Sequence, residues 1–222
     1  MSRYYFDYNA TTPLAPSVRQ VLRITLESDL KNPSSVHEEG RRAGRLLDEC
    51  REKTASLLGC LPDEICFLSG ATEANNAVFS SAWETRPQER SKIVTLAIEH
   101  DSVIRPLEHL KKKGMVMETV RVDRAGEVDE EALERAIDEK TLMVTVMAAN
   151  NETGIELPVE KVCRLAHEKG ALFHTDAACA IGKTSFHFGR LSADFASLSA
   201  HKFYGPKGIG ALLVRRKTKF TP

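Results

Sequence analysis

One lysine stands where an apolar run meets a turn rich in glycine and proline. Residues 197–210 read SLSAHKFYGPKGIG, and Lys202 lies between the two parts. A lysine at the end of a buried strand either extends its amine to solvent or is held for chemistry, because lysines are rarely buried without a partner. An amine held in this way can act as a nucleophile or carry a proton. The local stretch leaves both alternatives open.

Other polar residues follow apolar runs in the same manner. Thr72 comes after ICFLS and the small residues Gly70 and Ala71. A helix starting there would offer free N–H groups and its positive dipole end to a phosphate, although a plain N-cap threonine is the simpler interpretation. His100 follows KIVTLAI and Glu99. An imidazole at that place can cover an aromatic ring or move a proton, but most strand-end histidines are structural.

Three further runs also end in polar residues. Asn150 and Asn151 follow TLMVTVMA, and adjacent asparagines most often form a turn. Asp176 follows ALFHT, where a buried carboxylate would need a cation or a protonated heterocycle as its partner. Ser199 and His201 stand at the end of DFASLSA, just before the lysine.

Each signal is weak by itself, but together they describe one ligand. They supply a phosphate cradle, a ring-facing imidazole, amides, a buried carboxylate and a lysine. Pyridoxal 5′-phosphate (PLP) combines a protonatable ring nitrogen, a phenolic oxygen, a phosphate and an aldehyde that a lysine can bind covalently. The sequence therefore predicts a PLP site in which Lys202 carries the cofactor.

The elements that must position these residues alternate along the chain. Apolar runs typical of strands and amphipathic segments typical of helices succeed one another from residue 65 onward. The predicted strands are 65–69, 92–98, 115–122, 141–148, 171–176, 194–200 and 210–216, and the predicted helices are 38–58, 72–83, 102–114, 129–137 and 158–170. Strands apolar on both faces indicate an α/β fold with a mostly parallel sheet covered by helices. Such sheets bind ligands beyond the carboxyl ends of their strands.

Composition argues against several classes of partner. The chain has 222 residues, and its 31 Lys and Arg balance its 31 Asp and Glu, so no overall charge attracts nucleic acid or an anionic membrane. No apolar run suggests a signal peptide or a membrane span, so we expect a cytoplasmic protein. The five cysteines lack C-x-x-C spacing, so we expect neither a disulfide framework nor a metal site, and most should be buried thiols.

The chain resembles the cysteine desulfurases, a branch of the class V aminotransferases. The resemblance extends over essentially the whole chain and is carried, in the family's order, by YFDYNATTP, NPSSVH, SGATEANN, EHDSV, MAANNETG, HTDAACAIGK and SAHKFYGPKGIGALLVRR. It implies the large PLP-binding domain of the fold type I PLP enzymes over residues 16–222. It also implies an N-terminal segment, residues 1–15, that associates with a smaller domain largely missing here.

The resemblance assigns a role to each site residue. Lys202 would be the PLP lysine, Asp176 would pair with the pyridine nitrogen, and His100 would stack over the ring, which makes these three the expected catalytic residues. The remaining cofactor contacts are implied at Ala71, Thr72, Asn151, Cys179, Ser199 and His201, of which Asn151 approaches the ring oxygen and Ala71, Thr72, Ser199 and His201 hold the phosphate.

The implied reaction converts L-cysteine to L-alanine and leaves the sulfur as a persulfide on an enzyme cysteine, for iron–sulfur cluster biogenesis or other sulfur transfer. The implied partners are a second copy or a complementary chain, and a sulfur-acceptor or scaffold protein. Two alternatives remain open. One is another class V enzyme, such as a selenocysteine lyase or a transaminase, which its products would distinguish. The other is a non-catalytic assembly half.

Two departures from the family pattern bear on this expectation. Cys179 stands where the family usually has a glutamine that contacts the ring oxygen, and a thiol is a much weaker donor than an amide. The family's sequences also continue well beyond Pro222, where the nucleophilic cysteine loop and the arginine for the substrate carboxylate would lie. We therefore do not expect this chain alone to complete desulfuration.

Overall fold

One sheet organises the protein, of which the computed structural model describes residues 4–221. Within these residues the sheet has seven strands in the order β1-β7-β6-β5-β4-β2-β3. Their bounds are β1 Ile65–Leu68, β2 Lys92–Leu96, β3 Val116–Val120, β4 Thr141–Thr145, β5 Leu172–Asp176, β6 Phe195–Ser199 and β7 Gly210–Val214. Strand β7 is antiparallel to both of its neighbours, whereas β3, β2, β4, β5 and β6 pair in parallel. This confirms the predicted α/β fold with a mostly parallel sheet.

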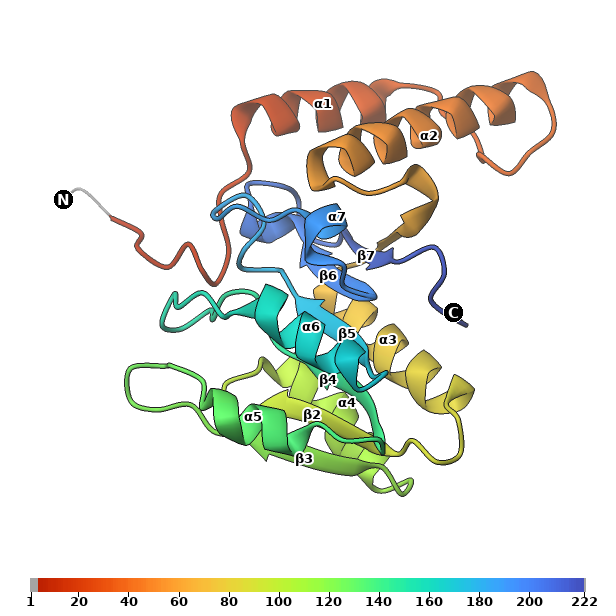
Figure 1. The fold of residues 1–222 in the computed structure, drawn as a ribbon. Helices are drawn as coiled ribbons and strands as arrows, with labels where there is room; N and C mark the ends of the chain where they lie inside the picture. The colour runs from red at the N-terminus through yellow and green to blue at the C-terminus, as the bar shows by residue number, and fades with distance from the viewer. Residues whose placement is uncertain (1–3, 222) are drawn as a thin grey trace.

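Helices cover both faces of the sheet (Figure 1). Helices α3 (Ala71–Thr85) and α4 (Asp101–Lys111) lie behind it in this view, and α5 (Glu130–Ala136) and α6 (Val159–Glu168) lie in front. Helices α1 (Pro16–Glu27) and α2 (Glu38–Leu58) stand at one end of the molecule, and the short α7 (Phe188–Leu191) precedes β6. The predicted long helix therefore has the expected bounds, while α1 was not predicted.

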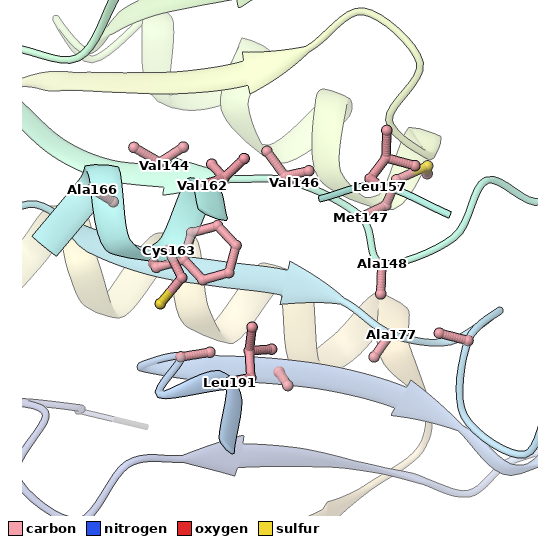
Figure 2. Close-up of a cluster of buried hydrophobic side chains, with 14 of the residues drawn as sticks. Val144, Val146, Met147, Ala148, Leu157, Val162, Cys163, Ala166, Ala177 and Leu191 are labelled. Atoms are coloured by element: carbon pink, nitrogen blue, oxygen red, sulfur yellow. The ribbon is translucent and has the colours of Figure 1, made fainter. Parts of the chain in front are cut away.

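Apolar side chains on both faces hold the central strands in register. Figure 2 shows Val162 and Cys163 of α6 packed over Val144 of β4. On the opposite face, Phe79 of α3 belongs to the cluster that contains Met143 of β4. All residues of β2, β4 and β6 are buried, as expected for strands covered on both sides. This packing aligns the carboxyl ends of the parallel strands along one edge, and the polar residues follow at that edge.

The cysteines are less buried than the sequence suggested. Only Cys163 is fully buried among the five; Cys50 and Cys66 are exposed, and Cys60 and Cys179 are half-buried. The expectation that most of the cysteines would be buried thiols is wrong. Cys50 lies on α2 and Cys66 on the edge strand β1, and each of these elements has one face open to solvent.

Helices that could span a membrane and groups of metal-binding side chains are both absent from residues 4–221. No helix within residues 4–221 is both long enough and apolar enough to cross a membrane. In that same part of the chain, no three His, Cys, Asp or Glu side chains gather in a way that could hold a metal ion.

Candidate active site

A cavity of about 270 Å³ opens at the carboxyl ends of the central strands. All nine cofactor residues predicted from the sequence line it: Ala71, Thr72, His100, Asn151, Asp176, Cys179, Ser199, His201 and Lys202. The structure also places five other residues in its wall, namely Ala10, Ser102, Met147, Ala149 and Ala178. Loops that follow β2, β4, β5 and β6, together with the start of α3, therefore converge on one space.

Lys202 is held inside this space. It ends the 3₁₀ turn Ala200–Lys202 that follows β6, and its Nζ donates a hydrogen bond of 2.6 Å to the main-chain oxygen of Asn9. The N-terminal segment is itself fixed, because the amide nitrogen and the hydroxyl of Thr12 both donate to the main-chain oxygen of His201, at 2.8 and 2.9 Å. Lys202 is half-buried. Its amine is nevertheless positioned, because it donates to a main-chain oxygen that is itself held in place.

Asp176 is a buried carboxyl group without a cationic partner. It is 6% exposed, Oδ1 accepts from the amide of Ala178 at 3.0 Å, and Oδ2 accepts from Nδ2 of Asn75 at 2.9 Å. Within residues 4–221 no Lys, Arg or His forms an ion pair with it. Neutral donors orient this group and leave its charge to be balanced by a protonated ligand.

His100 begins α4 as its N-cap. The amide of Ser102 donates to Nδ1 of the imidazole at 3.1 Å, and Oγ of Ser102 lies 2.8 Å from the same nitrogen. Because Nδ1 is occupied by these contacts, Nε2 is the ring nitrogen available to a ligand.

The start of α3 and the end of β6 form one end of the cavity, where hydrogen-bond donors gather. The amide of Ala71 donates to Oγ of Ser199 at 2.7 Å, so the Ser199 hydroxyl keeps its own hydrogen for another acceptor. The amide of Thr72 lies in the first helical turn, where the helix supplies no acceptor. The contact of the Ala71 backbone with a phosphate stays a prediction: in this structure its N–H donates to Ser199, and the amide of Thr72 is the one that the helix leaves without an acceptor.

Gly70 and Gly210 approach each other closely at this end of the cavity, next to the start of α3. A Cβ at Gly210 would lie 2.2 Å from the main-chain oxygen of Leu198 and 2.6 Å from Cα of Gly70. Glycine at the start of β7 therefore lets the turn before α3 come against the sheet.

Asn150 and Asn151 have different functions in the structure. Oδ1 of Asn150 accepts from the amides of Glu152 and Thr153, both at 2.9 Å, so this buried residue builds the turn. Asn151 lines the cavity and donates from Nδ2 to Glu152 at 2.6 Å.

Burial shifts the pKa values of two cavity residues, Cys179 and His201, in opposite directions. Burial raises the pKa of the Cys179 thiol, against an opposing effect of Lys202, and its Sγ lies 4.0 Å from the main-chain oxygen of Asn9. Burial lowers the pKa of His201, whose Nδ1 lies 3.1 Å from Oγ1 of Thr11, and the neighbouring Lys202 adds to this effect.

Three residues in or next to the site were not predicted. Asn75 and Ser102 are buried, and Nδ2 of Asn75 donates to Oγ of Ser102 at 2.9 Å. Glu99 is buried too; its Oε1 accepts from the amide of Met147 at 2.7 Å, while Oε2 has no partner. Burial raises the pKa of Glu99 well above its usual range, and nearby Asp176 adds to this effect. Asn75 is a polar residue on the apolar face of α3, four positions before Phe79. This break in the apolar pattern was the sequence signal that could have revealed it.

Sequence comparison decides the family. The family model described as Aminotransferase class-V matches residues 4–222. The chain belongs to the class-V aminotransferase family. Proteins that resemble it include the cysteine desulfurase IscS of Dictyoglomus turgidum, 39% identical over 98% of this chain and 55% of that protein. A cysteine desulfurase of Cereibacter sphaeroides is 43% identical over 100% of this chain and 58% of that protein.

Solved structures of similar proteins have the same fold. A NifS-like protein superposes with a TM-score of 0.96 at 40% identity and covers 100% of this chain, which matches 61% of that chain. A structure described as SspA in complex with cysteine gives a TM-score of 0.93 at 35% identity, over 98% of this chain and 63% of that one. The chain thus spans somewhat more than half the length of the relatives it matches.

Class-V aminotransferases are PLP-dependent enzymes, and the residues of this cavity fit that cofactor. The buried carboxyl group of Asp176 lacks a cation, which suits a protonated pyridine nitrogen. The free hydroxyl of Ser199 and the first-turn amide of Thr72 suit a phosphate. The amine of Lys202 enters the same cavity and suits the aldehyde.

Proposed function

We propose that this chain provides the PLP site of a cysteine desulfurase, which removes sulfur from L-cysteine and leaves L-alanine. The observation that carries the proposal is the placement of Lys202 and Asp176 in one cavity whose far end offers anion donors. The names of its class-V relatives support the substrate, since those relatives are cysteine desulfurases and one solved relative is described with cysteine bound.

In the proposed reaction PLP supplies a ring that accepts the electron pair from the substrate Cα. Lys202 would hold the cofactor, and its Nζ, when free, would take or return a proton at that carbon. Asp176, whose two oxygens are oriented by Asn75 and Ala178, would keep the proton on the ring nitrogen by balancing its charge. His100 would cover the ring, and its Nε2 would be a second proton carrier.

The other cavity residues position the cofactor in this proposal. The phosphate is held by Thr72, Ser199 and His201 at the start of α3 and the end of β6. Asn151 and Cys179 line the same cavity and would contact the phenolic oxygen. The thiol there is a weak donor, and we assign it no role as a sulfur acceptor because its burial disfavours the thiolate.

We also propose a domain organisation, partners and a location for the protein. Residues 16–222 form the PLP-binding domain, and residues 1–15 associate with a smaller domain; residues 1–3 and 222 of these ranges lie outside the described part. A second copy or a complementary chain completes the enzyme. Sulfur passes to an acceptor or scaffold protein for iron–sulfur cluster biogenesis, in the cytoplasm.

The test is to add PLP to the purified chain, reduce it with borohydride and map the modified peptide. We expect a visible absorbance band that borohydride bleaches and a label on Lys202. Lys202→Ala should lose the label, whereas Lys207→Ala, at an exposed lysine of the same loop, should keep it. A label on Lys183 or Lys207 with Lys202 unmodified would refute the site.

Products distinguish the proposed substrate from its alternatives. With L-cysteine and a dithiol reductant, an enzyme that contains this site should release alanine and sulfide, because the dithiol supplies the two electrons that reduce the persulfide sulfur. A keto acid would indicate a transaminase, and preference for selenocysteine would indicate a lyase of that class. A folded chain that takes up no PLP would leave only the assembly function.

A further inference from the structure

A continuous chain of hydrogen bonds joins Asp176 to His100 beneath the cavity. Nδ2 of Asn75 lies 2.9 Å from Oδ2 of Asp176 and 2.9 Å from Oγ of Ser102, and this Oγ lies 2.8 Å from Nδ1 of His100. Asn75 is fully buried and Ser102 is 8% exposed, so solvent offers these groups few substitutes. The direction of each bond can therefore be deduced.

The carboxylate of Asp176 only accepts hydrogen bonds. The amide nitrogen of Asn75, and not its oxygen, must face Asp176, and its second N–H then points at Oγ of Ser102. The Ser102 oxygen accepts that bond, which leaves its own hydrogen to be donated. The acceptor within reach is Nδ1 of His100.

The backbone reinforces this assignment. The amide of Ser102 also points at Nδ1 of His100, at 3.1 Å, so a hydrogen on Nδ1 would face an N–H group. Nδ1 consequently accepts, and a neutral imidazole with Nδ1 as acceptor carries its hydrogen on Nε2.

We propose that Asn75 and Ser102 are positioning residues that fix His100 as the Nε2–H tautomer. The proposal deepens the proposed function and rests on it for the role of His100 above PLP. Nε2 is then the ring nitrogen that gives a proton to the substrate or takes one from it. The same Asn75 amide orients Asp176, so a single side chain positions both groups that are proposed to act on the ring.

The tautomer can be measured directly in the full chain labelled with ¹⁵N-histidine. Long-range ¹H–¹⁵N spectra above neutral pH distinguish a protonated from an unprotonated ring nitrogen, and His100→Asn assigns the signals. We expect Nδ1 of His100 to be unprotonated and Nε2 to be protonated. A hydrogen on Nδ1 in the unmodified chain would overturn the proposal, and this measurement needs no variant that might fail to fold.

Variants test the two positioning residues. Ser102→Ala and Asn75→Ala should each reduce the tautomer preference about fivefold, the effect of one ordinary hydrogen bond. Ser102→Thr keeps the hydroxyl and should restore the preference. A folded Ser102→Ala or Asn75→Ala chain with an unchanged tautomer ratio would overturn the role of that residue.

Borohydride labelling separates this proposal from the proposed function. Nε2–H in a chain that never labels at Lys202 would support the hydrogen-bond assignment and refute the PLP site. A label at Lys202 with the hydrogen on Nδ1 would support the PLP site and refute the assignment.

Discussion

Asn75 donates a hydrogen bond of 2.9 Å to Asp176, which lies 101 residues later in the chain. The bond joins the first turns of α3 to the end of β5, two elements whose relative position depends on the packing of the whole sheet. It orients the carboxylate with a neutral donor and leaves its charge available. An asparagine suits this position because a cationic side chain would compete with a protonated ligand for Asp176.

Replacing Asp176 with asparagine should affect chemistry more than cofactor binding. The amide keeps an acceptor for Asn75 but cannot balance a protonated ring nitrogen. We expect Lys202 still to be labelled after borohydride, while exchange of the L-alanine Cα proton in D₂O, followed by NMR, slows roughly 100-fold or more, the scale of a lost electrostatic contact. Asp48→Asn, on α2, is the control and should exchange normally. Near-normal exchange in Asp176→Asn would contradict the role of this residue.

Cys179 should react slowly with alkylating reagents. Its burial raises the pKa of the thiol, so little thiolate is present at pH 8, whereas Cys50 and Cys66 are exposed. Time-resolved labelling with iodoacetamide and mass spectrometry should modify the two exposed cysteines first. After incubation of the PLP-loaded chain with L-cysteine, no persulfide is expected on Cys179. A reproducible persulfide there would show that it accepts sulfur.

Cys179→Gln should alter the spectrum of bound PLP. An amide is a stronger donor than a thiol, and a stronger donor near the phenolic oxygen favours the anionic oxygen. The pH titration of the visible band should therefore shift in the variant, with Lys202 still labelled. Cys50→Gln is the matched control on the surface. An unchanged titration would place Cys179 out of reach of the ring oxygen.

Glu99 should make the folded chain less stable as pH rises. The folded chain keeps a proton that the unfolded chain releases above its usual pKa of about 4.5, because burial raises the pKa of Glu99. This contribution is fully present below that pH and is lost, by up to about 1.4 kcal/mol per pH unit, as pH rises toward the folded pKa. The advantage of Glu99→Gln over the parent in urea unfolding should grow from pH 5 to pH 8. Glu89→Gln, at an exposed site, should show a difference independent of pH.

If the advantage of Glu99→Gln stayed constant over that range, Glu99 would be ionised in the folded chain. Its unpartnered Oε2 would then need a cation, which the described residues around it do not supply.

His174 should give the opposite dependence. Burial lowers its pKa to about 3, and its ring nitrogens are bonded to Thr145 at 2.8 Å and Ser197 at 3.0 Å. The unfolded chain takes up a proton below about pH 6.5, so stability is lost as pH falls from there toward 3. His174→Gln should be less stable at pH 7 but lose less stability on acidification, as measured by urea unfolding. Exposed His109→Gln should keep the parent's slope.

Much of the fold and site could be predicted because parallel strands impose a common geometry. The predicted helix 38–58 corresponds to α2, and the polar residues at the ends of β2, β4, β5 and β6 meet because those strands end at one edge. Helix α1 was not among the predicted helices; it buries none of its residues, and its apolar side chains Val21, Ile24 and Leu26 are exposed.

The contacts within the site were harder to predict. The bond from Asn75 to Asp176 depends on how far α3 is shifted along β5, and helical or strand periodicity carries no information on that shift. The burial of Glu99 could not be predicted, because glutamate side chains are usually exposed. Side-chain partners across elements follow from packing and not from local pattern.

The attachment of the N-terminal segment to the lysine turn has a consequence for how the protein is made. Thr11 and Asn9 contact residues 190 and 193 positions later, His201 and Lys202. At a synthesis rate of 5–20 residues per second, these early residues wait roughly 10–40 s for their partners to leave the ribosome. The wall of the cavity next to Lys202 is therefore one of the last parts to close. A nascent chain can form its first strands and helices long before it can bind a ligand there.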